Sequence, residues 1–365
     1  MRPPAQPSGT VRLDLTRRAP EGAEALRCNL SVLELTGDCL WTASDETCRL
    51  ERLRTLDGGA SYREHTSFSL ADLFDLPEGA RGEADVEGLC ADGGWLWITG
   101  SMSLTRKKPR RRENDAEEAL ARLRGVKRDA NRWLLGRVPC VRGPDESWQI
   151  SRSVDAGGGG LLEAACLKFG RRGNALTKAL RDDEHIARFL DVPAKENGFD
   201  VEGIAARGER VFLGLRGPVL RGWAVVLELC VEPRRRGRLK LRASGPQGTH
   251  YCKHFLDLHG LGIRDLKIRG DDLLVLAGPT MDLDGPVQLW RWPGALASSG
   301  PAVVSRDRLE RLLDLPYDEG CEHAEGIALL DRPGAPSRRL VAYDSPHERR
   351  LGGGLGIELD AFDLP

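Results

Sequence analysis

The feature that most constrains this chain is a strand–turn–strand repeat. Its two clearest copies, at 85–91 and 200–206, begin Asp-Val-Glu-Gly and continue through a polar turn into a second apolar run. Less regular copies begin at Asn29, Gly262 and His323. Apolar runs this short, separated by turns at this spacing, are typical of β-strands rather than helices. The chain is therefore predicted to be built from one repeated β unit.

Further apolar runs flank the later copies. Each of these copies is preceded by a leader, at 72–77, 188–193, 254–258 and 311–316, and followed by another run, at 133–138, 223–229, 287–292 and 356–362. A leader strand, two central strands and a following strand predict a four-stranded meander. Four-stranded sheets repeated along a chain are typical of a β-propeller, in which stacked blades bury one another's faces.

We therefore expect an all-β fold, a β-propeller of four-stranded blades that forms a single domain over residues 1–365. Five blades are favoured because five copies are legible; six is the alternative, because the interval between the second and third copies is about twice the later ones. Two helical insertions, near 106–132 and 172–190, would lengthen that interval instead. The N-terminal run Gly9–Leu15 is a spare strand, expected to complete the last blade and close the ring.

Composition excludes several classes of protein. Lys+Arg 54 against Asp+Glu 55 leaves a net charge of −1, which argues against a nucleic-acid-binding surface. No apolar stretch is long enough for a membrane helix, and the N-terminus lacks the apolar core of a signal peptide. The nine cysteines are scattered and form no Cys-x-x-Cys pair, so neither a disulfide framework nor a zinc knuckle is expected. These features predict a cytoplasmic protein with no membrane partner.

Candidate site residues emerge when the copies are aligned on their first central strand. One column then contains Ser31, Glu87, Glu202, Arg264 and Glu325, and a second column, two residues earlier, contains Asn29, Asp85, Asp200, Gly262 and His323. Side chains two apart on a strand share a face. If this strand is the innermost of each blade, the two columns form polar rings in the central channel. Glu87, Glu202, Glu325 and Arg264 are the catalytic candidates, and Asp85, Asp200 and His323 are ligand-binding candidates.

A third group of candidates follows the second central strand, where loops at one rim usually carry binding groups. It contains Asp45, Arg216 and Asp344, with Asp282 on a neighbouring loop. The basic run 106–112 precedes an acidic helical stretch, and such a run is usually a solvated, mobile arm. It lacks the interleaved aromatic residues of a nucleic-acid-binding surface, so nucleic acid is not expected as a partner.

Carboxylates held close together repel unless they share a cation or a proton. Three arrangements would offset the repulsion between the carboxylates of the rings. Arg264 could neutralise its neighbouring glutamates, a Ca²⁺ or Mg²⁺ ion could bind Glu87, Glu202 and Glu325, or a cationic or polyhydroxylated ligand could enter. The alternative interpretation is structural: the recurrent Glu-Gly would hold neighbouring backbones together.

The segments at 85–91, 200–206, 215–218 and 263–266 resemble the bacterial domain-of-unknown-function family 3616, from about residue 30 to the C-terminus. More distantly, the Glu-Gly-Ile-Ala unit is similar to the phytase-like esterase propellers. That resemblance implies a hydrolase with acidic, metal-assisted chemistry, although Ser31 and Arg264 depart from a wholly acidic ring.

Two functions follow as hypotheses. In the first, the chain is a hydrolase in which the ring glutamates hold a metal or act as general base, and Arg264 or Arg216 stabilises negative charge. In the second, it is a non-catalytic propeller that binds a small molecule or a protein partner and whose acidic rings are structural.

Overall fold

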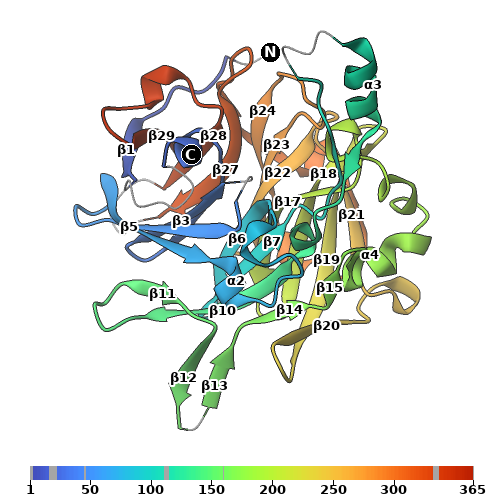
Figure 1. Cartoon of the computed structure of the whole chain (residues 1–365), viewed down its shortest axis with the longest axis horizontal. Coiled ribbons are helices and arrows are strands. Elements are labelled where there is room, and N and C mark those ends of the chain that lie inside the picture. Colours follow the sequence, from blue (N-terminus) through green and yellow to red (C-terminus); the bar gives the residue numbers. More distant parts are fainter. Residues whose placement is uncertain are drawn as a thin grey trace.

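Short strands bounded by turns dominate the chain, as the repeat predicts. The computed structural model describes residues 3–15, 23–44, 47–110, 115–158, 160–331 and 337–364. Figure 1 shows a fold made almost entirely of strands, with a few short helices at its edges. The all-β class is therefore confirmed.

Two units of the fold are simple four-stranded antiparallel meanders. The first consists of β2 (Leu30–Thr36), β3 (Cys39–Ser44), β4 (Arg49–Arg54) and β5 (Ser61–Ser69). The other consists of β22 (Gly262–Arg269), β23 (Asp272–Gly278), β24 (Val287–Trp292) and β26 (Glu310–Leu315).

Two further units are joined into one larger sheet. One consists of β6 (Val86–Asp92), β7 (Trp95–Gly100), β10 (Leu135–Arg142) and β14 (Ala165–Leu167), with β11 (Trp148–Ile150) also on β10. The next consists of β17 (Asp200–Arg207), β18 (Arg210–Leu220), β19 (Trp223–Arg234) and β21 (Cys252–Asp257). Strand β20 (Arg238–Arg242) pairs with both β19 and β14 and so joins the two units, and β25 (Ala302–Val304) extends β21.

The last unit takes its fourth strand from the start of the chain. It consists of β27 (His323–Leu330), β28 (Arg338–Asp344), β29 (Gly356–Asp363) and β1 (Gly9–Asp14). Val11 and Leu13 of β1 are buried, and β1 also pairs in parallel with β5 of the first unit. The prediction that this N-terminal run completes the last unit is confirmed.

The first strands of the five units lie against one another around a common centre. β2 contacts β6, β6 contacts β17, β17 contacts β22, β22 contacts β27, and β27 contacts β2 again. Apolar side chains fill the spaces between neighbouring sheets; for example, Phe212, Ile263 and Trp290 lie between the third and fourth units. The core is thus distributed among sheet interfaces, as expected when no single sheet can bury both of its faces.

The leader strands are a point on which the prediction was wrong. Residues 72–77 contain the end of helix α2 (Leu70–Leu73) and no strand, and 188–193 contain most of a 3₁₀ turn. The leaders at 254–258 and 311–316 fall on β21 and β26, which are the outer strands of the preceding units. In a meander the outer strand of one unit comes directly before the inner strand of the next, so proximity in sequence does not reveal the sheet to which it belongs.

Extra segments lengthen the interval between the second and third copies. The hairpin β8 (Thr105–Arg106) and β9 (Val126–Lys127) carries helix α3 (Ala116–Arg124), which Figure 1 shows at the upper edge. The hairpin β12 (Ser153–Gly157) and β13 (Gly160–Glu163) projects at the bottom of the same view. The small hairpin β15 (Phe169–Gly170) and β16 (Gly173–Asn174) leads into α4 (Ala175–Ala179).

The remaining helical elements are short. Helix α1 is Ala23–Cys28, and the 3₁₀ turns are Gly79–Arg81, Ala130–Trp133, Leu180–Asp182, Ala187–Phe189, Ala194–Glu196, Pro246–Gly248, Ala295–Ala297, Arg306–Arg308 and Glu348–Arg350. Within the described ranges, no helix has the length and apolar character needed to cross a membrane.

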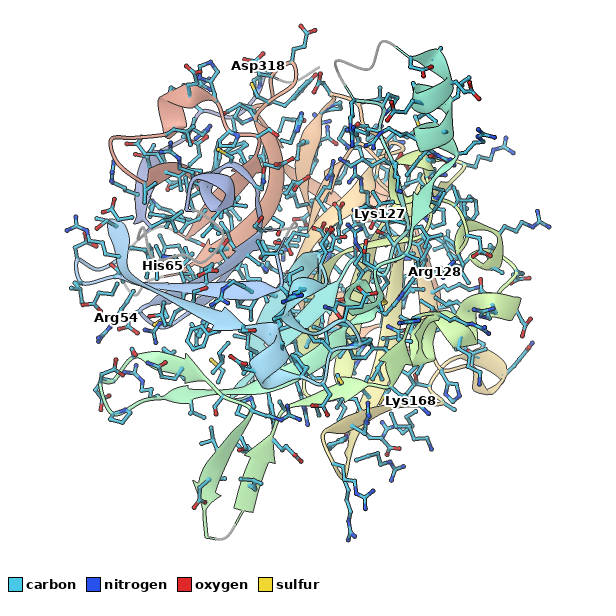
Figure 2. All side chains as sticks on the ribbon, in the orientation of Figure 1. Arg54, His65, Lys127, Arg128, Lys168 and Asp318 are labelled. Carbon is cyan, nitrogen blue, oxygen red and sulfur yellow. The ribbon has the colours of Figure 1, made fainter. Side chains whose placement is uncertain are left out.

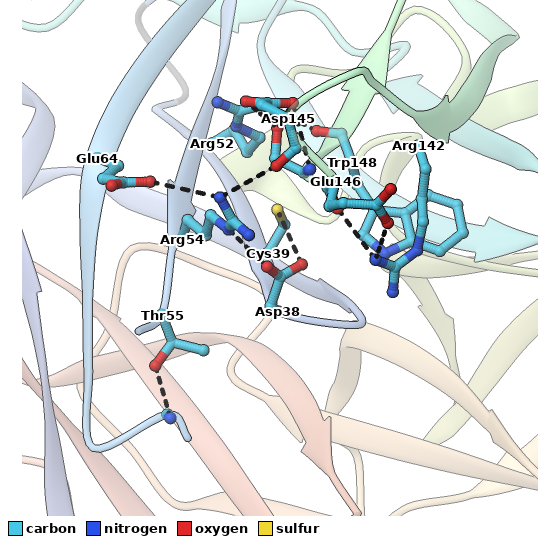
Figure 3. A network of polar contacts seen from close by, with 12 residues as sticks. Asp38, Cys39, Arg52, Arg54, Thr55, Glu64, Arg142, Asp145, Glu146 and Trp148 are labelled. Atoms are coloured by element: carbon cyan, nitrogen blue, oxygen red, sulfur yellow. Dashed lines mark hydrogen bonds and ion pairs between the residues drawn. The ribbon is translucent and has the colours of Figure 1, made fainter. Parts of the chain in front are cut away.

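Arginines of β4 anchor the β10–β11 hairpin to the first unit (Figure 3). Arg54 Nε donates to Asp38 Oδ2 at 2.6 Å, while its Nη1 approaches the carbonyl of Asp145 at 3.5 Å. Arg52 Nη1 donates to the carbonyl of Trp148 at 2.8 Å. These contacts join neighbouring units through a strand that is not one of the five inner strands.

Candidate functional site

A β-bulge occurs at the same place in all five inner strands. In β6, Val86 is paired with Gly100 and Gly88 with Thr99. Because Gly100 and Thr99 are consecutive, Glu87 is an extra residue with no partner on β7. The corresponding extra residues in β2, β22 and β27 are Ser31, Arg264 and Glu325, and in β17 the extra residue lies in the pair Glu202–Gly203. A bulge re-aims the side chain that it carries. The first predicted column is therefore a column of bulges.

The glycines that follow the ring glutamates have a packing role. A Cβ on Gly203, whose φ is +96°, would lie 2.7 Å from Asp265 Cα on the next inner strand. A Cβ on Gly88 would lie 2.9 Å from the backbone nitrogen of Ile204. Backbones approach this closely only where a side chain is absent. The Glu-Gly pair thus combines a ring residue with a contact between units.

A cavity of about 700 Å³ lies over this ring. Seven acidic side chains line its floor: Glu83, Asp85, Glu87, Asp200, Glu202, Glu325 and Asp344. Two arginines, Arg132 and Arg216, line the same region. Its volume falls in the range of small-molecule sites, which typically measure about 300–1,000 Å³.

Two buried arginines hold Glu202. Arg216 Nη1 donates to Glu202 Oε1 at 2.9 Å, and Arg264 Nη1 lies 3.2 Å from Glu202 Oε2. Arg264 Nη1 also lies 2.7 Å from Glu325 Oε1, so one guanidinium bridges two units of the ring. Arg216 is itself fixed by the carbonyl of Thr280, which accepts from its Nε at 3.1 Å. Of the three arrangements expected for the ring, the structure therefore contains neutralisation by Arg264.

A further arginine, Arg132, pairs with two acidic residues that precede β6. Arg132 Nη1 is 2.7 Å from Asp85 Oδ2, and its Nη2 pairs with Glu83. The same Nη1 donates to Ser103 Oγ at 3.3 Å. Arg132 lies in a 3₁₀ turn before β10, outside the repeat, so the column alignment contained no signal for it.

These contacts give the carboxyl groups of the floor different pKa values. Burial raises the pKa of Glu202, but Arg264 and Arg216 outweigh that effect and hold its pKa below the ordinary value. Burial, reinforced by Glu202, raises the pKa of Asp200 to about 7. Burial also raises the pKa of Glu325 to about 8, with Asp344 and Glu202 adding to it and Arg264 opposing it. The floor thus contains both ionised carboxylates and carboxyl groups that titrate near neutral pH.

The ring does not fit the predicted calcium or magnesium ion. Between Glu202 and Glu325 stands the guanidinium of Arg264, which takes the position that a metal ion shared by these two carboxylates would need. No group of three His, Cys, Asp or Glu side chains within the described parts of the chain is arranged to hold a metal. The donor set at Glu87, Glu202 and Glu325 is therefore unlike an oxygen cage for a hard cation.

Most of the predicted site residues converge on this one cavity: Asp85, Glu87, Asp200, Glu202, Arg216, Glu325 and Asp344 all line it, as does Asp282. Arg264 lies behind the floor and acts on it through Glu202 and Glu325. His323 is not among the lining residues; its Nε2 lies 2.9 Å from Asp284 Oδ1. Ser31 donates to the carbonyl of Val86 at 2.8 Å and so joins two inner strands. Asp45 lies outside the residues that the structure describes.

The outer wall of the cavity comes from segments that the sequence did not assign to a site. Arg106, Lys107 and Lys108, expected to belong to a solvated arm, lie on or beside β8 and line the cavity. Lys127 of β9 and Lys195 of the 194–196 turn complete this basic wall. Pairing of β8 with β9 fixes the beginning of the basic run against the fold.

A smaller cavity of about 200 Å³ lies farther along the same inner strands. Its central group is Lys267, whose Nζ lies 3.1 Å from Glu34 Oε2 and 3.3 Å from Asp265 Oδ2, and donates to the carbonyl of Leu89 at 3.0 Å. This buried ammonium joins three inner strands and has its hydrogen bonds satisfied, which is the arrangement of a structural ion pair.

Comparisons with known proteins give the following. The comparison with curated proteins finds no match. The structure is similar to the glutaminyl cyclase of Myxococcus xanthus, at 11% identity over 98% of this chain and 99% of that one, with a TM-score of 0.39. It is also similar to the PQQ-bound aldose sugar dehydrogenase of Streptomyces coelicolor, at 11% identity over 99% and 100%, TM-score 0.38. A third similar structure is the Malassezia sympodialis allergen Mala s 1, at 7% identity over 93% and 95%, TM-score 0.44.

The repeat residues that form the bulged ring fall inside the span of one family model. That model, described as "Protein of unknown function (DUF3616)", matches residues 29–360, from the first inner strand to the last strand of the fifth unit. The chain therefore belongs to the DUF3616 family.

Proposed function

We propose that the chain is a five-bladed β-propeller that binds a small polar molecule at one mouth of its central channel and hydrolyses it by acid–base chemistry. The blade count is supported by the five inner strands that contact one another in a closed order, each of them the first strand of a four-stranded unit. Extra hairpins and short helices, rather than a sixth blade, then account for the long interval after the second copy.

One observation carries the catalytic part of the proposal: carboxyl groups in different electrostatic environments share one cavity. Asp200 is 3% exposed and, among the described residues, makes no ion pair. Glu325 is largely buried against Arg264, while Glu202 is ionised between two arginines. Pairs of titratable groups whose environments separate their pKa values are the usual acid and base of an active site.

The roles follow from these environments. Asp200, whose burial raises its pKa to about 7, accepts a proton from the attacking water. Glu325, whose burial raises its pKa to about 8, donates its proton to the leaving group. Arg216 lines the cavity and stabilises negative charge that develops on the substrate. Arg264 contacts both Glu202 and Glu325 and is a positioning residue. No step in this scheme uses a metal ion.

The test is a hydrolysis screen with carboxylester and phosphoester substrates. Loss of general acid or base catalysis lowers rates by about 10²–10⁴-fold, so we expect Asp200→Asn and Glu325→Gln each to lower kcat by at least about 100-fold. The rate should follow a bell-shaped pH profile, rising as Asp200 deprotonates and falling as Glu325 does. Glu310→Gln, on the exposed face of β26, is the control. Unchanged turnover in both cavity variants would overturn the assignment.

A non-catalytic role is the second candidate, favoured by the tight pairing of Glu202 with Arg216 and Arg264. Such a ring would serve the stability of the propeller and leave the cavity to bind a ligand or a protein partner. It predicts binding without turnover of any substrate and no pH-dependent rate. In either case we expect EDTA or added Ca²⁺ to leave the melting temperature unchanged; stabilisation by Ca²⁺ would support the metal site instead.

We also propose a reducing, cytoplasmic environment. All nine cysteines are free thiols, and seven of them are buried, where Cys behaves as a small hydrophobe. The proposal is tested by fractionating cells that express the full chain; recovery in a secreted fraction would contradict it.

A further inference from the structure

We propose that the cavity takes a zwitterionic small molecule, with its cationic end on the carboxylate floor and its anionic group against Lys107 and Lys127 of the wall. The inference rests on the proposed function only in using the same cavity as the binding site. It names the chemical class of the ligand from the distribution of charge around that cavity.

The wall is a cluster of cations. Its basic residues are Arg106, Lys107, Lys108, Lys127 and Lys195, against the two acidic wall residues Glu196 and Asp282. They come from three separate segments, namely the beginning of the basic run, the second strand of its hairpin, and the 3₁₀ turn at Ala194–Glu196. The fold therefore gathers the positive charge at one place although the chain as a whole is nearly neutral.

Ion pairs account for only part of this charge. Arg106 pairs with Glu196, and its Nη2 donates to Glu196 Oε2 at 3.0 Å. Asp282 is shared by Lys108 at 2.6 Å and Lys195 at 3.5 Å, so one carboxylate faces two ammonium groups. No acidic side chain within the described ranges lies within ion-pair distance of Lys107 or Lys127, and both lysines are exposed.

Backbone pairing places these two lysines diagonally across one hairpin. Lys127 is paired with Thr105, and the amide of Lys107 donates to the carbonyl of Gly125 at 3.0 Å. Lys107 and Lys127 are thus two residues apart in register, which places them on the same face of the hairpin within reach of long side chains, and both line the cavity. Two lysines without carboxylate partners on one face of a hairpin can both direct their ammonium groups to one anionic group, such as a phosphate or a carboxylate.

The floor has the opposite sign. Its seven carboxyl groups face Arg132 and Arg216, with Arg264 behind them, which leaves an excess of four acidic groups over basic ones (seven minus three). If Asp200 and Glu325 both hold a proton, two negative charges remain in excess (five minus three). A cationic group that donates hydrogen bonds therefore gains most by binding there.

Apolar residues line the cavity together with the two charged zones. They are Leu104, Pro193 and Ala194. A ligand with a single charge would satisfy one zone and leave the other to water. A molecule with an ammonium group at one end and an anionic group at the other complements both, and this complementarity gives specificity.

The test compares three matched probes by isothermal titration calorimetry with the full chain: phosphoethanolamine, which has both charges, ethanolamine and inorganic phosphate. We expect phosphoethanolamine to bind at least tenfold more tightly than either of the others. In the Lys107→Ala/Lys127→Ala variant, its affinity should fall at least tenfold while ethanolamine binding is unchanged. The control variant Lys168→Ala/Lys240→Ala removes two exposed lysines that do not line the cavity; Figure 2 shows Lys168 well away from Lys127.

Several results would overturn the inference. They are the absence of binding by phosphoethanolamine, equal affinity for all three probes, and equal loss of affinity in the two lysine variants. Circular dichroism of each variant shows whether it is folded; because both lysines are exposed, we expect no loss of stability. Failure of the hydrolase proposal is distinguishable, because binding is measured without turnover. Tight, lysine-dependent binding with no hydrolysis would support the ligand inference and contradict the hydrolase proposal.

Discussion

Equivalent positions of the ring have different chemistry because their neighbours differ. Glu202 and Glu325 are both bulge residues of inner strands, and both contact Arg264. Glu202 has a second arginine, Arg216, and remains ionised, whereas Glu325 has Asp344 nearby and the pKa that burial raises to about 8. The presence or absence of a second arginine thus determines whether a ring carboxyl group can act as an acid at neutral pH.

This difference makes stability depend on pH. Because burial raises the pKa of Glu325 from 4.5 to about 8, the folded state binds its proton more tightly than the unfolded state. The resulting stabilisation is complete below the unfolded pKa and is lost as pH rises through the folded value, at about 1.4 kcal/mol for each pKa unit. We expect the free energy of unfolding in urea to fall between pH 5 and 9 in the parent protein and to fall less in Glu325→Gln. Parallel pH curves for the two proteins would contradict the assignment.

Removal of the Glu202 charge is expected to be strongly destabilising. Glu202→Gln leaves Arg216 and Arg264 buried with fewer negative partners, and breaking a buried pair in this way costs about 3–5 kcal/mol. Glu310→Gln is the matched control, because its 3.0 Å pair with Arg291 is exposed and should contribute less than about 1 kcal/mol. Chemical denaturation of both variants measures the difference. Similar losses would show that the ring pairs are not energetically distinct from surface pairs.

Among the elements of the fold, the bulge and the glycine that follows the bulge residue act together. The glycine lets neighbouring inner strands approach, and the bulge directs the preceding side chain to the cavity. The sequence predicted the column because the Glu-Gly pair recurs. It could not predict the bulge itself, since a simple period of two also places Asp85 and Glu87, or Asp200 and Glu202, on one face.

A pair of glycine variants separates close packing from backbone conformation. A Cβ at Gly203 would lie 2.7 Å from Asp265 Cα, whereas a Cβ at Gly208, in the β17–β18 turn, meets nothing within 4 Å although its φ is +62°. We expect Gly208→Ala to lose only the conformational term of about 1–2 kcal/mol and Gly203→Ala to lose more, because two inner strands must move apart. Thermal unfolding measures both. Equal shifts in melting temperature would mean that the close approach has no energetic importance.

Other site residues escaped prediction for definable reasons. Arg132 and the basic wall lie in insertions that do not repeat, so alignment of the copies gives no information about them. His323 shares a column with Asp85 and Asp200, but Asp284 on a neighbouring loop holds its ring. Contacts made by loop residues cannot be predicted from the sequence pattern of the strand that they touch.

At the scale of the whole molecule, the ends of the chain meet in one sheet. Six residues of β1 pair with β29, and β1 also touches β5, so the N-terminal strand joins the last unit to the first. The all-β class and this closing strand could be predicted from short apolar runs. The assignment of outer strands to units could not, because the sequence gives the order of strands but not their sheets.

Loss of the closing strand should therefore weaken the whole ring. Deletion of residues 1–15 exposes the edge of β29 and removes the buried side chains of Val11, Leu13 and Leu15, each worth about 1.5–3 kcal/mol. We expect a lower urea midpoint and concentration-dependent association through the exposed edge. Deletion of residues 1–4 is the control, since it leaves β1 intact. A fully stable monomer without residues 1–15 would contradict the role assigned to this strand.

The bulges have a consequence for how the ring can change its chemistry. A bulge residue has no partner of its own in the strand ladder, and the same register shift occurs with different side chains at this position. Serine, arginine and glutamate already occupy this position in different units of one chain. Selection can thus exchange the chemical groups over the channel one unit at a time, limited mainly by the charge of the adjacent side chains, while the scaffold beneath them stays the same.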